Sequence, residues 1–189
     1  MKPVVTGTPS GTCPLEPDRF IAGLIGSFQG RPAAAFEARL PLDHLGPAGT
    51  ISRMYELFEH TADLGLRMRA STLAELFAEA ARGLFSVLLT NLYEVRPVCE
   101  RKFQLESDGR EFLLFDWLNE LLYTFESERL VFTEFEVRID GNSLEAVCRG
   151  ESFDLKRHGA DHEVKAITYH GLNVTAQSDG WTAEVIVDI

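Results

Sequence analysis

WTAEVIVDI, residues 181–189, is the stretch that decides the fold of this chain. Successive side chains of a strand point to opposite faces, and here one face is apolar throughout. An unattached terminus is typically polar, so an apolar strand at the end of the chain predicts a docked strand. Docking would fix the Asp188 side chain beside the α-carboxylate of Ile189, and closely spaced oxygen anions are the ligands of hard divalent cations. The alternative is a final strand that simply ends in an aspartate.

The length, composition and charge of the chain are typical of one acidic globular domain with an additional segment. The 189 residues are 45% hydrophobic and 25% charged, which is typical of one globular domain. The formal net charge is -11 and the pI is about 4.9. Affinity for nucleic acid depends on clustered lysine and arginine that release counterions. The charge therefore argues against a broad RNA-binding surface and predicts that any connection to RNA is indirect.

Cysteine usage and the N-terminus predict a cytoplasmic protein. Cys13, Cys99 and Cys148 form no CxxC pair and cannot all pair with one another, which suits a reducing compartment. The chain lacks the apolar core of a signal peptide, and no stretch reaches the roughly 18 apolar residues of a membrane span. We therefore expect no association with a membrane.

Residues 1–53 differ in composition from the remainder. Seven of the eight prolines lie there, and only Arg19–Phe28 offers an apolar run. Such a segment buries too little surface to offset the entropy of the chain. We expect a Pro/Gly-rich leader over 1–53, either disordered or translated from a start codon upstream of the native one, and a globular domain over 54–189.

From Met54 onward, periodicity predicts a mixture of strands and helices. Thr72 to Glu75 forms a capping box before one helix, and Asp108 to Glu111 begins a second. Strands are expected at 55–59 with 66–70, 101–107, 130–140, 143–153, 164–176 and 181–189. The order β-α-β-α-β-β-β-β predicts an α+β fold: a two-layer sandwich with a largely antiparallel sheet and two helices.

The tetrapeptide His60-Thr-Ala-Asp63 lies between the two segments of the first strand. It combines an imidazole, a hydroxyl and a carboxylate. The functional interpretation places Asp63 opposite Asp188 on a neighbouring strand, where both carboxylates would bind a metal. The alternative is a polar turn in which the aspartate bonds to its own backbone.

Two other groups of ionisable residues are weaker candidates. His158 and His162 would share a face if their segment were helical, but an intervening glycine and the strand that follows predict a charged, solvated loop over 154–163. Asp116 and Glu120 are spaced i, i+4 on the second helix, where a solvated face is a simpler explanation than a shared cation.

Four blocks of sequence together resemble the archease family. They are HTADLG (60–65), DWLNELLY (116–123), VKAITYHGL (164–172) and VDI (187–189). Their order and spacing match those of the family, so the resemblance covers Met54 to Ile189 as an archease-like domain and leaves the leader outside.

The resemblance implies a protein that is not itself an enzyme but a cofactor of the RtcB-type tRNA and RNA ligase. That ligase joins RNA with a 2',3'-cyclic phosphate or 3'-phosphate to a 5'-hydroxyl, using GTP and manganese through a guanylylated histidine. Archease proteins are understood to promote this guanylylation and multiple turnover in tRNA splicing and RNA repair. The implied partner is the ligase, and RNA is reached only through it.

The resemblance also implies a bound divalent metal, either calcium or manganese. Its ligands would be Asp63, Asp188 and the terminal carboxylate of Ile189, all of which match the family pattern. His60, Lys165 and His170 lie inside the matching blocks, and we expect them around the metal or at the interface with the ligase.

Two alternative functions belong to other classes. A metal-dependent phosphoester hydrolase would combine Asp63 and Asp188 with His158 and His162. A general chaperone or interaction module would need none of these side chains. The sequence offers no P-loop, nucleophile elbow or cysteine ligand set that would favour either alternative.

Overall fold

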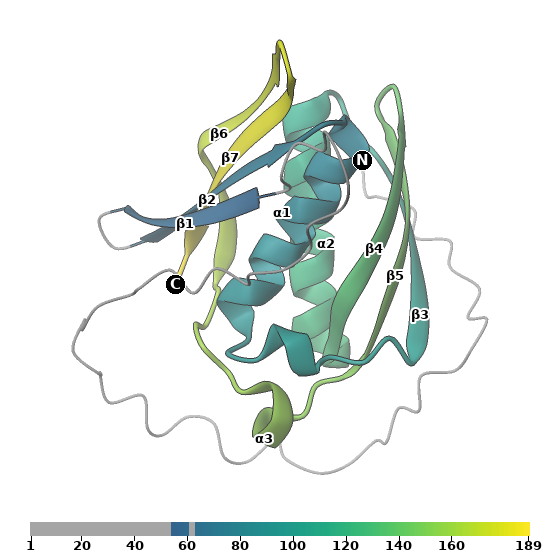
Figure 1. Ribbon diagram of the computed structural model, residues 1–189, viewed down its shortest axis with the longest axis vertical. Helices are drawn as coiled ribbons and strands as arrows, with labels where there is room; N and C mark the ends of the chain where they lie inside the picture. Colours follow the sequence, from purple (N-terminus) through teal and green to yellow (C-terminus); the bar gives the residue numbers. More distant parts are fainter. Residues whose placement is uncertain (1–53, 61–62) are drawn as a thin grey trace. The chain divides into compact units, whose positions relative to one another are not determined.

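Two antiparallel sheets flank a pair of helices in the computed structural model, which describes residues 54–60 and 63–189 (Figure 1). The leader predicted for 1–53 lies outside the described residues. The first sheet has the order β1 (Met54–His60), β2 (Asp63–Ala70), β7 (Gly180–Asp188), β6 (Ala166–Gln177). The second sheet has the order β3 (Cys99–Glu106), β5 (Ser143–Ser152), β4 (Leu130–Asp140).

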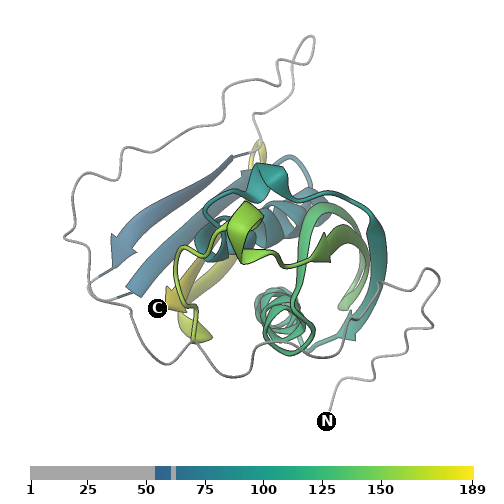
Figure 2. The same cartoon turned by 90° about the horizontal axis from the view of Figure 1, so that it is seen from below.

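The two long helices form the layer between the sheets, as Figure 2 shows. Helix α1 (Leu73–Leu88) begins where the Thr72 hydroxyl accepts a hydrogen bond from the Glu75 N–H at 3.2 Å, as the capping box predicts. Helix α2 (Arg110–Glu128) ends at Arg129, which takes a left-handed conformation with φ 54°. The Trp117 indole donates a 3.1 Å hydrogen bond to the Phe77 carbonyl and so joins α2 to α1.

Aromatic side chains connect the helices to the second sheet. Phe85 of α1 meets Phe132 of β4 edge to face with centroids 5.8 Å apart, and Phe103 of β3 meets Trp117 of α2 in the same way at 5.5 Å. Such pairs add to the stabilisation that comes from burying apolar area. The core is therefore continuous from the helix layer into the second sheet.

Two short helical elements complete the described chain: η1 (Leu92–Glu94) follows α1, and α3 (Leu155–His158) follows β5. No helix in the described residues is long and apolar enough to cross a membrane.

The predicted α+β class with antiparallel strands is confirmed, and the structure adds two details. The sequence predicts one sheet, whereas the strands are divided between two sheets on either side of the helices. The segments expected as one interrupted strand form a hairpin in which His60 pairs with Asp63. Both details depend on pairing between distant segments, which periodicity does not report.

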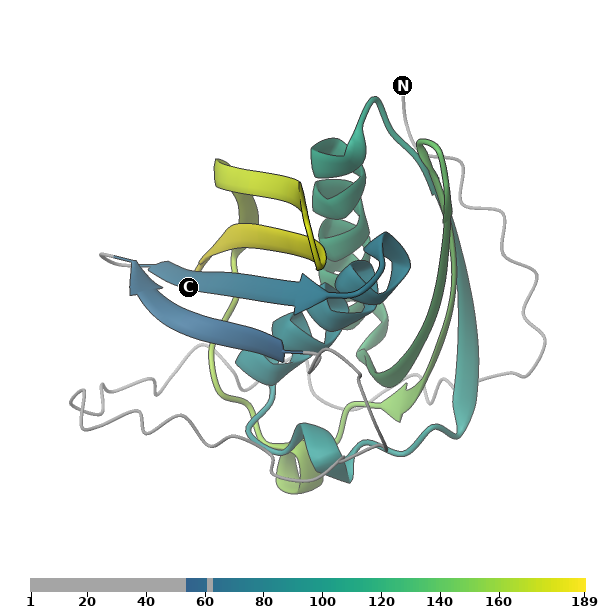
Figure 3. The same ribbon diagram turned by 45° about the horizontal axis from the view of Figure 1, so that its top comes forward.

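The terminal strand β7 docks between β2 and β6, as the apolar alternation predicts (Figure 3). Val185 and Val187 are fully buried, and Ala183 is nearly so. The hairpin near the start of the described chain and the final strand are thereby neighbours in one sheet.

Gly150 gives a direct test of the second sheet. A Cβ on this residue would lie 1.8 Å from the Val131 carbonyl oxygen, which is backbone and cannot move aside. We predict that Gly150→Ala lowers the free energy of unfolding by at least about 2 kcal/mol in urea denaturation. Glu145→Ala, at an exposed position of the same strand, should change it by less than about 0.5 kcal/mol. Equal stability of the two variants would contradict this packing.

Candidate metal centre

Asp63 is the first residue of β2 and Asp188 is the last residue of β7, each one residue beyond the last pair of the β2–β7 ladder. The two strands pair antiparallel from Leu64–Val187 to Ala70–Trp181. Continued by one residue, the same register would place Asp63 opposite Asp188, and directly opposed residues project from the same face of a sheet. Both residues are partly exposed.

This arrangement fits a divalent cation chemically. Like charges directly opposite each other in a sheet are destabilising, and a cation between them removes the repulsion. Among the described residues, neither carboxylate has an ion pair or side-chain hydrogen bond, and no group of three His, Cys, Asp or Glu side chains could hold a metal. The oxygens of Asp63, Asp188 and Ile189 are of the type that calcium prefers, so the donor chemistry of the predicted ligands is compatible with a divalent cation.

Lys165 holds the end of β7 in place. Its backbone N–H donates a 2.8 Å hydrogen bond to the Asp188 carbonyl, and its Nζ donates one of 2.8 Å to the Ile189 oxygen. Ala166, the next residue, pairs with Asp188 across the β6–β7 ladder. Lys165 therefore lies beside the predicted metal ligands. His170 is exposed on β6, and the His60 side chain lies outside the described residues.

Gly65, two residues beyond Asp63, allows the β1–β2 hairpin to pack closely. A Cβ at this position would lie 2.0 Å from the ring of Phe58, so the ring covers the glycine. The Arg67 guanidinium in turn lies 4.9 Å from the centroid of the Phe58 ring. These contacts fix the strand that presents Asp63.

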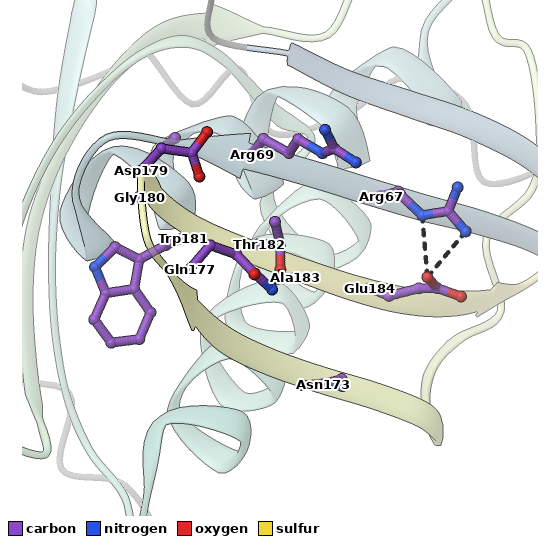
Figure 4. A pocket seen from close by; sticks show the side chains of 11 residues that line it. Arg67, Arg69, Asn173, Gln177, Asp179, Gly180, Trp181, Thr182, Ala183 and Glu184 are labelled. Atoms are coloured by element: carbon purple, nitrogen blue, oxygen red, sulfur yellow. Dashed lines mark hydrogen bonds and ion pairs between the residues drawn. The ribbon is translucent and has the colours of Figure 1, made fainter. Parts of the chain in front are cut away.

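A polar hollow of about 370 Å³ lies further along the first sheet (Figure 4). Its residues include Arg67 and Arg69 of β2 and Glu184 of β7, and Arg67 pairs with Glu184 at 3.1 Å. The hollow contains neither Asp63 nor Asp188. Sequence reasoning did not single it out, because alternating polar residues on a strand are also typical of a plain solvated face.

The segment around His158 corrects one sequence prediction. The expected solvated loop instead contains α3, and His158 is completely buried. The Asp154 N–H donates to His158 Nδ1 at 3.1 Å, so Nε2 carries the proton toward Glu151 Oε1 at 3.3 Å. Arg157 binds both oxygens of Glu151 at 2.6 Å. The Asp154 cap and this buried ion pair fold the segment onto β5, which a count of charged residues does not predict.

His162 lies apart from this cluster, with its Nδ1 3.6 Å from an oxygen of Asp161. Within the described residues, the histidines and the two facing aspartates do not form a common metal group. The combination required by a hydrolase is therefore not assembled.

Asp116 and Glu120 of α2 are both partly buried and have different surroundings. Asp116 accepts a hydrogen bond from the Ser107 hydroxyl. Burial raises the pKa of Glu120, opposed by the nearby Arg101 charge. The two carboxylates are thus neither a simple solvated face nor a shared cation site.

The Glu151 cluster makes stability depend on pH. Hydrogen bonds from Arg157 are the main cause that lowers the pKa of Glu151 to about 2, with a backbone hydrogen bond from Arg96 contributing. Because the pKa is lower in the folded state, the stabilisation is complete above the ordinary glutamate pKa of about 4.3 and is lost as pH falls toward 2.

We predict that Glu151→Gln costs about 3 kcal/mol in unfolding at pH 7, because Arg157 loses its buried partner. The gap between variant and wild type should narrow as pH falls from about 4.3 toward 2. Urea denaturation across this range measures it. A gap that is independent of pH would show that the carboxylate charge is not the cause.

Taken together, these features define a small α+β protein with two antiparallel sheets around a helix pair and an aspartate at each of two adjoining strand ends. The model of the Archease protein family (MTH1598/TM1083) matches residues 55–189. "Protein archease" of Methanosarcina barkeri is 39% identical over 142 residues, covering 72% of this chain and 97% of that protein. "Protein archease" of Pyrococcus furiosus is also 39% identical over 142 residues, covering 72% and 99%.

A solved structure shows the same fold. The solution structure of Methanobacterium thermoautotrophicum protein 1598 is 34% identical, with a TM-score of 0.64, covering 71% of this chain and 98% of that one. This chain belongs to the archease family. Family membership supports a role as a protein cofactor.

Proposed function

We propose that this protein is a cytoplasmic activator of an RtcB-type RNA ligase, and that it promotes ligase guanylylation and multiple turnover in tRNA splicing or RNA repair. Membership in the archease family supports a cofactor role rather than catalysis by this chain itself. The observation that carries the proposal is the register of β2 and β7, which pairs Leu64 with Val187 and so supports Asp63 and Asp188 as neighbours at the next position.

The chain's own residues would present a divalent cation, calcium or manganese, to the ligase. Asp63 and Asp188 bind it from adjacent strands, and the Ile189 carboxyl group adds a further oxygen. Lys165 keeps the Ile189 carboxyl group in position through its 2.8 Å hydrogen bond. When bound, the cation supplies positive charge that stabilises charge developing on a transferring nucleotidyl phosphate.

The net charge of -11 supports a protein partner rather than direct RNA binding. An RNA ligase must present a basic surface to hold RNA, and opposite potentials steer association and fix the register of the complex. RNA would then be reached through the ligase alone.

The hydrolase alternative has less support. It requires His158 close to the aspartates, but His158 is buried beside Glu151 and Arg157. No observation in the described residues favours a general chaperone.

The proposal predicts that the donor set is essential for activation. Asp63→Ala and Asp188→Ala should each reduce stimulation of ligase guanylylation by about 10- to 100-fold, because each removes a metal ligand. Adding one glycine after Ile189 should do the same, because it replaces the carboxylate with an amide. Guanylylation is measured by transfer of labelled GMP to the ligase, with this protein in limiting amount.

Asp140→Ala is the matched control, because Asp140 is also an aspartate at the end of a strand but is exposed on the second sheet. It should activate as wild type does. Full activation by all three altered proteins would end the metal proposal, and no activation by wild type would end the proposed function.

A further inference from the structure

Three aromatic rings, two exposed and one partly buried, form a cluster where α2 meets β6. Phe115 of α2 stacks on Tyr169 of β6 with ring centroids 3.7 Å apart, and Phe112 meets Tyr169 edge to face at 5.5 Å. Phe112 is 49% exposed and Tyr169 is 50% exposed. We call Phe112, Phe115 and Tyr169 the aromatic surface. Exposed apolar side chains that gather in this way commonly mark interaction sites.

The backbone positions Tyr169 for contact with another molecule. β6 is an edge strand, and its pairing with β7 is interrupted between Thr168 and Asn173, so Tyr169 lies in an irregular segment. Such irregularities re-aim side chains at sheet edges. One face of the Tyr169 ring is covered by Phe115, and half of the residue remains open to solvent.

Helix α2, which carries Phe112 and Phe115, is acidic as a whole. It has five acidic residues, of which Glu128 is paired with Arg101, and one basic residue, Arg110, which lies 4.8 Å from the Trp181 ring. Asp116 lies one residue beyond Phe115 and is held by the Ser107 hydroxyl. Its charge adds to the effect of burial in raising the pKa of Tyr169, as expected for a carboxylate near the phenol.

We propose that the aromatic surface, together with Asp116, docks an arginine-bearing basic face of the ligase; this inference rests on the proposed function. An arginine guanidinium stacks on the open face of an aromatic ring while hydrogen bonding to a carboxylate. Tyr169 supplies the ring and Asp116 the carboxylate. A polyanion such as RNA would be repelled by the acidic residues of α2. Docking by this surface is distinct from metal binding by Asp63 and Asp188.

The test measures the dissociation constant of the full chain for the ligase by calorimetry. Phe112→Ser and Tyr169→Ser should each weaken binding at least about tenfold, as expected for exposed aromatic anchors. Tyr93→Ser is the matched control, because Tyr93 is 79% exposed on η1, and it should bind as wild type. Unchanged thermal unfolding in each variant shows that the fold is kept. The association rate should fall as salt is raised.

A second experiment distinguishes docking by the aromatic surface from metal binding, by comparing ligase binding with ligase activation in the same variants. Asp188→Asn should still bind the ligase but fail to activate it, whereas the aromatic variants should regain activation at high protein concentration. Equal ligase binding by wild type and both aromatic variants would overturn the inference and leave the proposed function intact.

If wild type neither binds nor activates the ligase, the proposed function fails. Titration with an octa-arginine peptide then tests whether the aromatic surface binds arginine. Amide NMR shifts at Phe112, Asp116 and Tyr169 on titration with the peptide would support an arginine-binding surface. Absence of these shifts, or stronger binding of single-stranded RNA to the same residues, would overturn it.

Discussion

The pairing of β2 with β7 is the constraint on which the rest of the structure depends. It joins a strand near the start of the described chain to the last strand, with Leu64 opposite Val187 and Ala70 opposite Trp181. Because side chains alternate with a period of two, a slip of one residue would turn Val185 and Val187 out of the core and separate Asp63 from Asp188. The burial of Val185 and Val187 therefore fixes the register that would bring Asp63 and Asp188 together at the next position.

Stability and function are separated in this molecule. The Glu151, Arg157 and His158 cluster is buried, has its hydrogen bonds satisfied, and fixes α3 against β5. Asp63 and Asp188 differ from this cluster in that they are partly exposed and do not stabilise the fold. Two like charges placed opposite each other at the end of a sheet are destabilising. Residues that do not favour the folded state are expected at positions where function requires them. This contrast supports assigning a function to Asp63 and Asp188 and a structural role to His158.

Much of the fold could be predicted from local pattern. The Thr72 cap, the aromatic load of α2 and the alternation ending at Val187 each specify an element from residues close together in sequence. The division into two sheets could not be predicted in this way, nor could the burial of His158 under an ion pair. Those features depend on contacts between distant segments, which propensity and periodicity do not contain.

The candidate site was predictable only in part. The residue types and the position of Asp188 beside the last residue suggested a metal, and the order of sequence blocks suggested the family. The closeness of Lys165 to Ile189, and the ring of Phe58 over Gly65, became apparent only in three dimensions. The aromatic surface was missed because Phe112 and Phe115 resemble ordinary core residues of a helix, and the stacking partner Tyr169 comes from a distant strand.

The central claim is that the β2–β7 register creates a cation site from Asp63, Asp188 and the Ile189 carboxyl group. Calorimetric titration of the chelator-treated full chain with calcium, and separately with manganese, tests it most directly. We expect one binding event in wild type that is weakened at least about tenfold in Asp63→Asn and in Asp188→Asn and is unchanged in Asp140→Asn. Equal cation affinity in all four proteins, or no binding of either cation by wild type, would contradict the account.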